Sequence, residues 1–144
     1  MSEEKKPQFA IQRVYVKDLS FEGPNSPEIF QKEWAPDLAV ELDTTHRQLE
    51  GDFWEASVKV STKVKSGEEI AFVCEVDQAG IFTISDFNKD QREHLLESIC
   101  SEILFPFARE AIADAVSKGG FPQLLLAPIN FEAYYQEKKK QAEK

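Results

Sequence analysis

Side chains that could do chemistry, other than carboxylates, are few and scattered. The chain has two histidines and two cysteines, His46, His94, Cys74 and Cys100, with no C-x-x-C pair. A cysteine nucleophile needs a lowered thiol pKa, whereas both cysteines occupy apolar positions where burial raises that pKa. A structural zinc ion needs four ligands close together, and these four residues fall in segments of different predicted structure. We therefore expect no metal site and interpret both cysteines as buried thiols.

The other residue types also give no catalytic pattern. None of the six glycines builds a dinucleotide-binding or phosphate-binding loop, and no G-x-S-x-G elbow is present. The 26 acidic residues guarantee that some carboxylates are neighbours, which does not identify an acid–base pair. The sequence predicts no catalytic residue and no cofactor. An enzyme that binds a small molecule stays an alternative, which loss of turnover on mutating Cys74 or Cys100 would favour.

Composition excludes several classes of partner. A chain of 144 residues that is 42% hydrophobic, with eleven phenylalanines, can build the core of a single domain. Its formal net charge of −9 repels nucleic acid phosphates and anionic lipids and favours basic partners. The longest apolar runs are short and contain prolines, and the N-terminal segment lacks a signal-peptide hydrophobic region. We expect a cytoplasmic protein without a nucleic acid partner and without direct membrane insertion.

The first half of the chain has the alternation of β-strands. Apolar and polar residues alternate over 38–42, most clearly over 54–64, and again over 70–76, with Gly67 in a turn. The short gaps between these segments indicate a four-stranded, mainly antiparallel sheet. The first strand, 9–22, has apolar residues of both parities and is predicted to be covered in part on both faces: Phe9, Ile11, Tyr15, Leu19 and Phe21 share one parity, and Val14 and Val16 the other.

Helical spacing replaces this alternation after Asp90. Apolar residues recur every three or four positions from Leu96 to Ala115, and Gly119-Gly120 ends the predicted helix. Asn130 is a plausible N-cap for a last helix. Strands first and helices last predict an α+β fold: a four-stranded antiparallel sheet, then a long helix and a C-terminal helix. The expected boundaries are a flexible N-terminus (1–8), one domain (9–136) and a flexible charged tail (137–144).

The predicted sheet has more apolar side chains than two helices can cover. A partly shielded sheet face implies self-association or the capture of another apolar chain. On the fourth strand, Phe72, Cys74 and Val76 are candidates for such a surface. Plain packing in the core is the alternative for all three, and the sequence pattern leaves it open.

Several sequence blocks, in order over residues 9–135, match one known family. They are Ile11–Asp18, Ser20–Asn25, Phe30–Trp34, Phe72–Val76, Gln78–Phe82, Ile103–Glu110, Phe121–Leu124 and Leu126–Phe131. Together they resemble the SecB-type protein-export chaperones, whose helix motif Leu-Phe-Pro-Tyr-Ala-Arg-Glu is matched with Phe107 in place of tyrosine. The chain departs from the family at Ser101-Glu102, which replaces a Pro-Asn pair, and at Gln123–Leu126, which is more apolar than usual.

The resemblance implies the function of a holding chaperone. Such a protein binds non-native preproteins in long apolar grooves without ATP, keeps them competent for translocation and delivers them to the SecA motor. The family fold is an α+β subunit that assembles as a homotetramer, a dimer of dimers. A SecB-like chaperone dedicated to one client, such as an antitoxin, is the alternative within the same fold, and the breadth of clients separates the two.

The resemblance also assigns roles to residues. The acidic sheet surface of the family recognises the basic zinc-binding tail of SecA, and the matching positions here are Asp18, Glu22, Val73 and Glu75. Positions matching Cys74, Val76 and Gln78 are tied in the family to subunit association and substrate holding. With Phe72, they form the predicted substrate-binding or subunit-association set: Phe72, Cys74, Val76 and Gln78.

Overall fold

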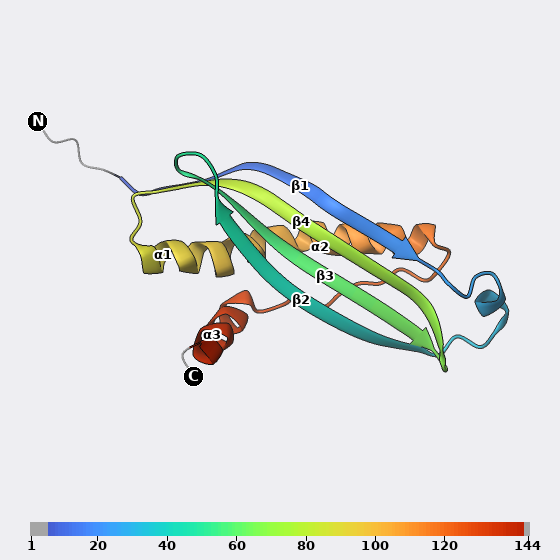
Figure 1. Ribbon diagram of the computed structural model, residues 1–144. Coiled ribbons are helices and arrows are strands. Elements are labelled where there is room, and N and C mark those ends of the chain that lie inside the picture. Colours follow the sequence, from blue (N-terminus) through green and yellow to red (C-terminus); the bar gives the residue numbers. More distant parts are fainter. Residues whose placement is uncertain (1–5, 143–144) are drawn as a thin grey trace, which may run out of the picture.

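The alternating segments form four long strands in one antiparallel sheet. The computed structural model describes residues 6–142, and the predicted N-terminal and C-terminal tails lie partly outside that range. The strands are β1 (Gln8–Glu22), β2 (Pro36–Gln48), β3 (Phe53–Ser66) and β4 (Glu69–Ser85), in the sheet order β1-β4-β3-β2 (Figure 1). The strands β1 and β2 are therefore the two edges of the sheet, and the predicted fold class is confirmed.

Two β-bulges change the direction of side chains along β1. The register with β4 shifts between Ile11 and Arg13 and again between Val16 and Asp18. Each bulge adds one residue to β1, so the simple alternation of faces is broken there. Val14 and Val16 consequently lie on the same sheet face as Ile11, and the grouping of apolar residues by parity along this strand is wrong.

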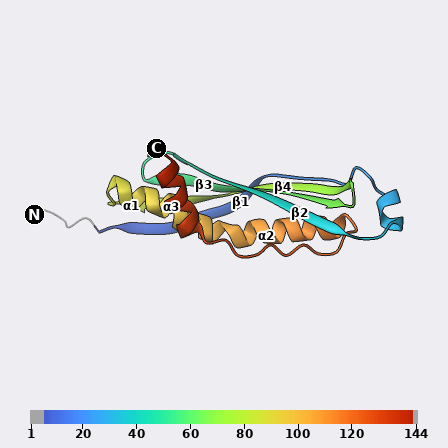
Figure 2. The same ribbon diagram turned by 90° about the horizontal axis from the view of Figure 1, so that it is seen from below.

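The helices follow the strands and pack on one sheet face. They are the one-and-a-half-turn α1 (Lys89–His94), a π-helical turn η2 (Leu95–Ile99), the long α2 (Cys100–Lys118) and α3 (Phe131–Ala142). Figure 2 shows α2 running along one side of the sheet. A short 3-10 turn, η1 (Glu28–Gln31), lies between β1 and β2. The core lies between the sheet and α2, where the largest fully buried side chains include Phe72, Phe82, Leu104 and Ile112.

Local capping fixes where the helices begin and end. Asn88 caps α1 in a capping box with Gln91, a signal that the sequence pattern alone did not single out. At the end of α2, Gly120 has a φ of +88°, and the Phe121 amide donates to the Val116 carbonyl at 3.2 Å. This left-handed C-cap reverses the chain direction and is most favourable for glycine. The predicted cap of α3 is confirmed, because Asn130 Oδ1 accepts a hydrogen bond from the Ala133 amide at 3.0 Å.

Candidate binding surfaces of the sheet

The four residues predicted to dock SecA lie together on the sheet face that lacks helices. Glu22 is paired with Val73 across β1 and β4, and Glu75 is paired with Ser20. The second bulge of β1 brings Asp18 onto this face, opposite Asp77. The structure therefore gathers Asp18, Glu22, Val73 and Glu75 on two adjacent strands, and we call these four residues the acidic patch.

The carboxylates of the acidic patch stay exposed and largely uncompensated. Asp18, Glu22 and Glu75 are exposed, and within residues 6–142 none of them forms an ion pair. Glu75 instead accepts a hydrogen bond at 2.8 Å from Ser61 on β3. Lys63, which is also on β3, is paired with Val73 of β4 and borders the patch. A row of solvated carboxylates of this kind attracts cationic segments of a partner.

A second charged cluster on the same face was not predicted. Glu55 on β3 accepts hydrogen bonds from Tyr15 of β1, from Lys17 at 3.1 Å and from Arg47 of β2 at 3.1 Å. Burial alone would raise the pKa of Glu55, but these three donors outweigh it and lower the pKa. Burial and the bond to Glu55 raise the pKa of Tyr15 to about 12. The cluster joins the two edge strands to β3, and it depends on the bulge that turns Tyr15 to this face, which the sequence did not predict.

The second predicted set lies in the core of the subunit. Phe72, Cys74, Val76 and Gln78 are all at most 2% exposed, on the face of β4 that α2 covers. The core-packing alternative therefore describes their position in the single chain, and their role in client binding or subunit association stays a prediction. Gln78 Nε2 donates to the Tyr15 carbonyl at 3.1 Å, whereas Gln78 Oε1 has no partner among the described residues.

An aromatic pocket opens at the end of the sheet where β2 begins. Its volume is about 300 Å³, and its lining includes Trp34, Leu38, Phe72 and Leu124. The ring of Phe121 packs between these elements, with its centroid 5.0 Å from Phe72 and 5.7 Å from Trp34. We call this site the aromatic pocket. The feature of the sequence that marks this site is the apolar connection after Gly120, which is bounded by Pro122 and Pro128.

Apolar side chains continue beyond the pocket along both edge strands. On β2, Leu38 and Val40 are 41% and 42% exposed. On β1, Val16 and Leu19 are each 46% exposed. Exposed apolar groups in such rows are typical of interaction surfaces rather than of closed monomers. The exposed large apolar residues are Ile11, Val16, Leu19, Phe30, Trp34, Leu38, Val40, Phe53, Phe107 and Leu125.

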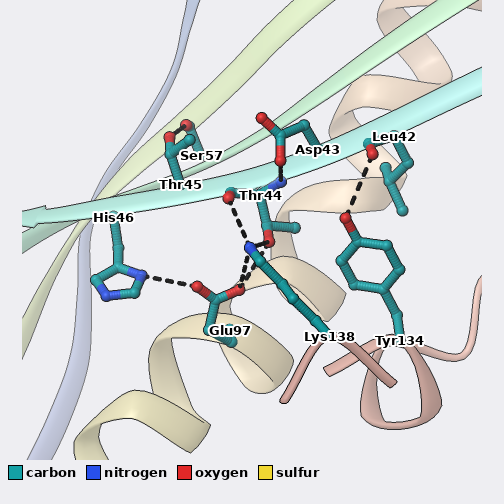
Figure 3. A network of polar contacts seen from close by, with 9 residues as sticks. All are labelled: Leu42, Asp43, Thr44, Thr45, His46, Ser57, Glu97, Tyr134 and Lys138. Carbon is teal, nitrogen blue, oxygen red and sulfur yellow. Dashed lines mark hydrogen bonds and ion pairs between the residues drawn. The ribbon is translucent and has the colours of Figure 1, made fainter. Parts of the chain in front are cut away.

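A buried glutamate joins β2 to α3 at the other end of the β2 row (Figure 3). Glu97, in the π-helical turn, accepts a hydrogen bond from Thr44 Oγ1 at 2.7 Å and lies 3.1 Å from His46 Nδ1. Lys138 of α3 lies 3.4 Å from the same carboxylate. Burial by itself would raise the pKa of Glu97, but His46, Thr44 and Lys138 outweigh it and hold the pKa at about 2. This network was not predicted from the sequence.

Neither cysteine is placed to act as a nucleophile. Burial raises the pKa of the Cys74 thiol to about 11 and that of Cys100 to about 12, so neither thiolate is available as a nucleophile at neutral pH. Over residues 6–142, no helix has the length and apolar character needed to span a bilayer. What the described residues offer is an acidic face, an aromatic pocket and exposed apolar rows.

Sequence comparisons match this chain to one protein family. The family model described as "Preprotein translocase subunit SecB" matches residues 2–142. "Protein-export protein SecB" of Ectopseudomonas mendocina is 51% identical over 136 residues, which cover 94% of this chain and 84% of the relative. The Stutzerimonas stutzeri protein of the same description is 52% identical over 130 residues, which cover 90% of this chain and 79% of that one.

One solved structure has the same fold at much lower sequence identity. It is the Mycobacterium tuberculosis Rv1957 SecB-like chaperone in complex with a ChAD peptide from the Rv1956 HigA1 antitoxin. The TM-score is 0.71 at 12% identity, and the match covers 84% of this chain and 90% of that chain. At this identity the likeness concerns the fold alone.

Proposed function

This chain belongs to the SecB family of protein-export chaperones, and we propose that its two sheet faces divide the work of that function. The apolar side holds non-native preproteins without ATP and without catalysis, and the acidic face delivers them to the SecA motor. We place this work in the cytoplasm, where preproteins are made and where SecA collects them. The observation that carries the proposal is the aromatic pocket together with the exposed apolar rows along β1 and β2.

Client holding follows from the breadth of the apolar surface. Removing apolar area from water contributes about 25 cal/mol per Å², with little demand on the shape of the partner. The entropy lost by ordering an unfolded client opposes binding, so several contacts along one client are needed at the same time. Phe30, Trp34 and Leu125 present apolar surface near the connection that follows α2, and Leu38 and Val40 extend it along β2.

Delivery depends on charge on the opposite face. We propose that the acidic patch binds the basic, zinc-binding tail of SecA, with Asp18, Glu22 and Glu75 as the charges and Val73 as an apolar contact. Exposed acidic side chains also keep a protein with much apolar surface soluble. The charges lie across the sheet from the aromatic pocket, so docking and holding can proceed together.

We propose a homotetramer, a dimer of dimers, as the working form. The apolar row of β1 is exposed in the single subunit. A second copy of the chain can cover it, because the same edge of two identical subunits can pack against itself about a twofold axis. Phe72, Cys74, Val76 and Gln78 would support this assembly from within the core, by fixing the position of β4 beneath the surface residues.

Two assays test the division of work. Suppression of aggregation, measured on several unrelated denatured proteins, tests client holding, and protection of one client alone would favour the dedicated chaperone instead. The double variant Asp18→Lys with Glu75→Lys is expected to weaken SecA binding about tenfold or more, since both charges face the partner. Its suppression of aggregation should stay within about twofold of the parent protein, because surface charges away from the pocket contribute little to apolar binding.

A matched control separates position from charge. Glu50→Lys with Asp52→Lys makes the same charge change at exposed positions of the turn between β2 and β3. This control should bind SecA nearly as well as the parent protein. Equal loss of SecA binding in both double variants, or equal loss of both activities in the first, would reject a separate docking face.

A further inference from the structure

The outer edge of β2 is partly occupied by side chains of α3. Tyr134 Oη donates to the Leu42 carbonyl at 3.3 Å, and Lys138 Nζ donates to the Thr44 carbonyl at 3.2 Å (Figure 3). The Thr44 amide donates to the Asp43 side chain at 3.0 Å. These are the backbone groups through which another strand would pair, since β2 has a strand neighbour on one side only. The side chains of α3 therefore take the place of a pairing strand at Leu42–Thr44.

The same edge is open a few residues earlier. Backbone groups two residues apart point the same way from a strand, so the carbonyls of Leu38 and Val40 face the same edge as those of Leu42 and Thr44. No side chain within residues 6–142 bonds to either of these two carbonyls in the way that Tyr134 and Lys138 bond to theirs. The open part of the edge begins at the aromatic pocket, which Leu38 also lines.

The hold of α3 on this edge is mainly polar. Only Phe131 and Tyr135 of α3 are buried. Glu132, near the start of α3, accepts hydrogen bonds from Ser98 at 2.8 Å and pairs with His94 at 2.6 Å. Near its end, Lys138 is fixed by Glu97, whose side chain is only 9% exposed. Because Lys138 also reaches Thr44 Oγ1 at 3.1 Å, Glu97 and Thr44 together set where α3 lies on β2.

We propose that Glu97 is a positioning residue that holds α3 as a cap on the β2 edge, so that an extended client segment can pair along Pro36–Val40 but not beyond. This inference rests on the proposed function. The partner that we propose for this open edge is an extended segment of a non-native polypeptide in which apolar and basic residues alternate. Its apolar residues fit Leu38 and Val40, and a basic residue fits the exposed carboxylate of Asp37 on the opposite face of β2.

A peptide length series tests the cap directly. The probes are fluorescein-labelled peptides of alternating valine and lysine, from about six to about twelve residues long, spanning the open edge and the capped edge of β2. For the parent protein, we expect affinity to stop rising once the peptide exceeds the open edge. For Glu97→Gln, affinity should keep rising with length and exceed that of the parent by about fivefold for the longest peptide, since each extra pair adds backbone bonds.

Two milder variants test the cap even if Glu97→Gln does not fold. Tyr134→Phe and Lys138→Met each remove one hydrogen bond from the surface of α3 to a backbone carbonyl of β2. In both variants, the affinity should stop rising at a greater peptide length than in the parent protein. Lys140→Met is the control, because Lys140 is exposed on the same helix and, within residues 6–142, takes no part in the hydrogen bonds that Tyr134 and Lys138 make to β2. Amide exchange should be about tenfold faster in α3 of Glu97→Gln and unchanged in the control.

The outcomes separate this inference from the proposed function. If the parent protein binds no peptide and protects no denatured client, the proposed function fails and the cap fails with it. If the parent protein holds clients but every variant has the same plateau as Lys140→Met, the cap alone is rejected. Self-association of Glu97→Gln in place of longer peptide pairing, seen as a rise in mass by light scattering, would also reject it.

Discussion

The two edge strands of the sheet differ in how far the rest of the chain covers them. On β2, side chains of α3 bond to the backbone at Leu42 and Thr44, and buried Glu97 anchors that contact. On β1, two bulges interrupt the register and place apolar residues on the helix side of the sheet, where Val16 and Leu19 stay about half exposed. One edge is covered by polar contacts within the chain, and the other has an apolar row that the chain leaves uncovered.

This difference implies different lifetimes for the two contacts. An apolar row needs a partner that buries area, and burial of this kind is lasting once a symmetric assembly has formed. A polar contact held by a few side chains can open without exposing much apolar surface. We therefore expect the β1 edge to suit the lasting association of subunits that we propose, and the open part of the β2 edge, beside the polar cap, to suit contacts with a client that form and break.

The largest effect should come from placing charge in the apolar row of β1. Val16→Lys with Leu19→Lys puts two desolvated cations into the proposed subunit contact, which should weaken association by more than about a hundredfold. Light scattering at micromolar concentration should show the tetramer mass for the parent protein and a mass approaching the 16.4 kDa of one chain for the variant.

Substitutions on the opposite face of β1 provide the control. Ala10→Lys with Ser20→Lys adds the same charge to exposed positions that are paired with Thr83 and Glu75, away from the helices. This control should keep the tetramer mass. A tetramer in both double variants would show that the apolar row of β1 is not the subunit contact. The contrast between the two edges would then be wrong for β1.

A smaller effect is expected from the β2 edge, through the ionisation of Glu97. Its pKa falls from 4.5 to about 2 on folding, so ionised Glu97 contributes up to about 3 kcal/mol to the free energy of unfolding at neutral pH. Because the folded pKa is the lower one, this contribution is complete above about pH 4.5 and is lost as the pH falls toward 2. Glu97→Gln should be less stable than the parent at pH 7, and the difference should shrink in acid.

Urea unfolding at fixed protein concentration measures this difference, since assembly makes the transition concentration-dependent. Glu132→Gln is the matched control: hydrogen bonds from Gln136, His94 and Ser98 lower the pKa of Glu132 to about 2 as well, but its side chain is 50% exposed. Solvent screening should leave this control close to the parent protein. A difference between parent and Glu97→Gln that does not change with pH would mean that the charge of Glu97 does not hold α3.

The sequence predicted the parts of the fold in which one periodicity runs without interruption. Alternation over β3 and helical spacing over α2 gave both elements, and the start of α3 at Asn130 followed from its capping chemistry. The faces of β1 were wrong, because the prediction assumed strict alternation and each bulge adds one residue to the count. Local sequence does not mark a bulge when the residues beside it are ordinary strand formers.

The candidate surfaces were predictable to the extent that they follow strand register. The family resemblance gave all four residues of the acidic patch, and the outward parity of Val73 and Glu75 on β4 agrees with their grouping. The polar cap was not predictable in this way. Glu97, Thr44 and Lys138 come from three elements that are distant in sequence, and a glutamate in a helical stretch has no local pattern that distinguishes burial from solvent exposure.

The smallest effect concerns the start of α3 and tests which contact governs the β2 edge. Asn130→Ala removes the side-chain acceptor for the Ala133 amide and should cost about 1 kcal/mol of local stability. Amide exchange should then be a few times faster in the first turn of α3, whereas the bonds of Tyr134 and Lys138 to β2 should persist because Glu97 still fixes Lys138. Asn130→Asp keeps the acceptor and should behave like the parent protein. If Asn130→Ala instead opens all of α3 as far as Glu97→Gln does, then the cap depends on the helix itself, and the buried carboxylate is not what distinguishes this edge from β1.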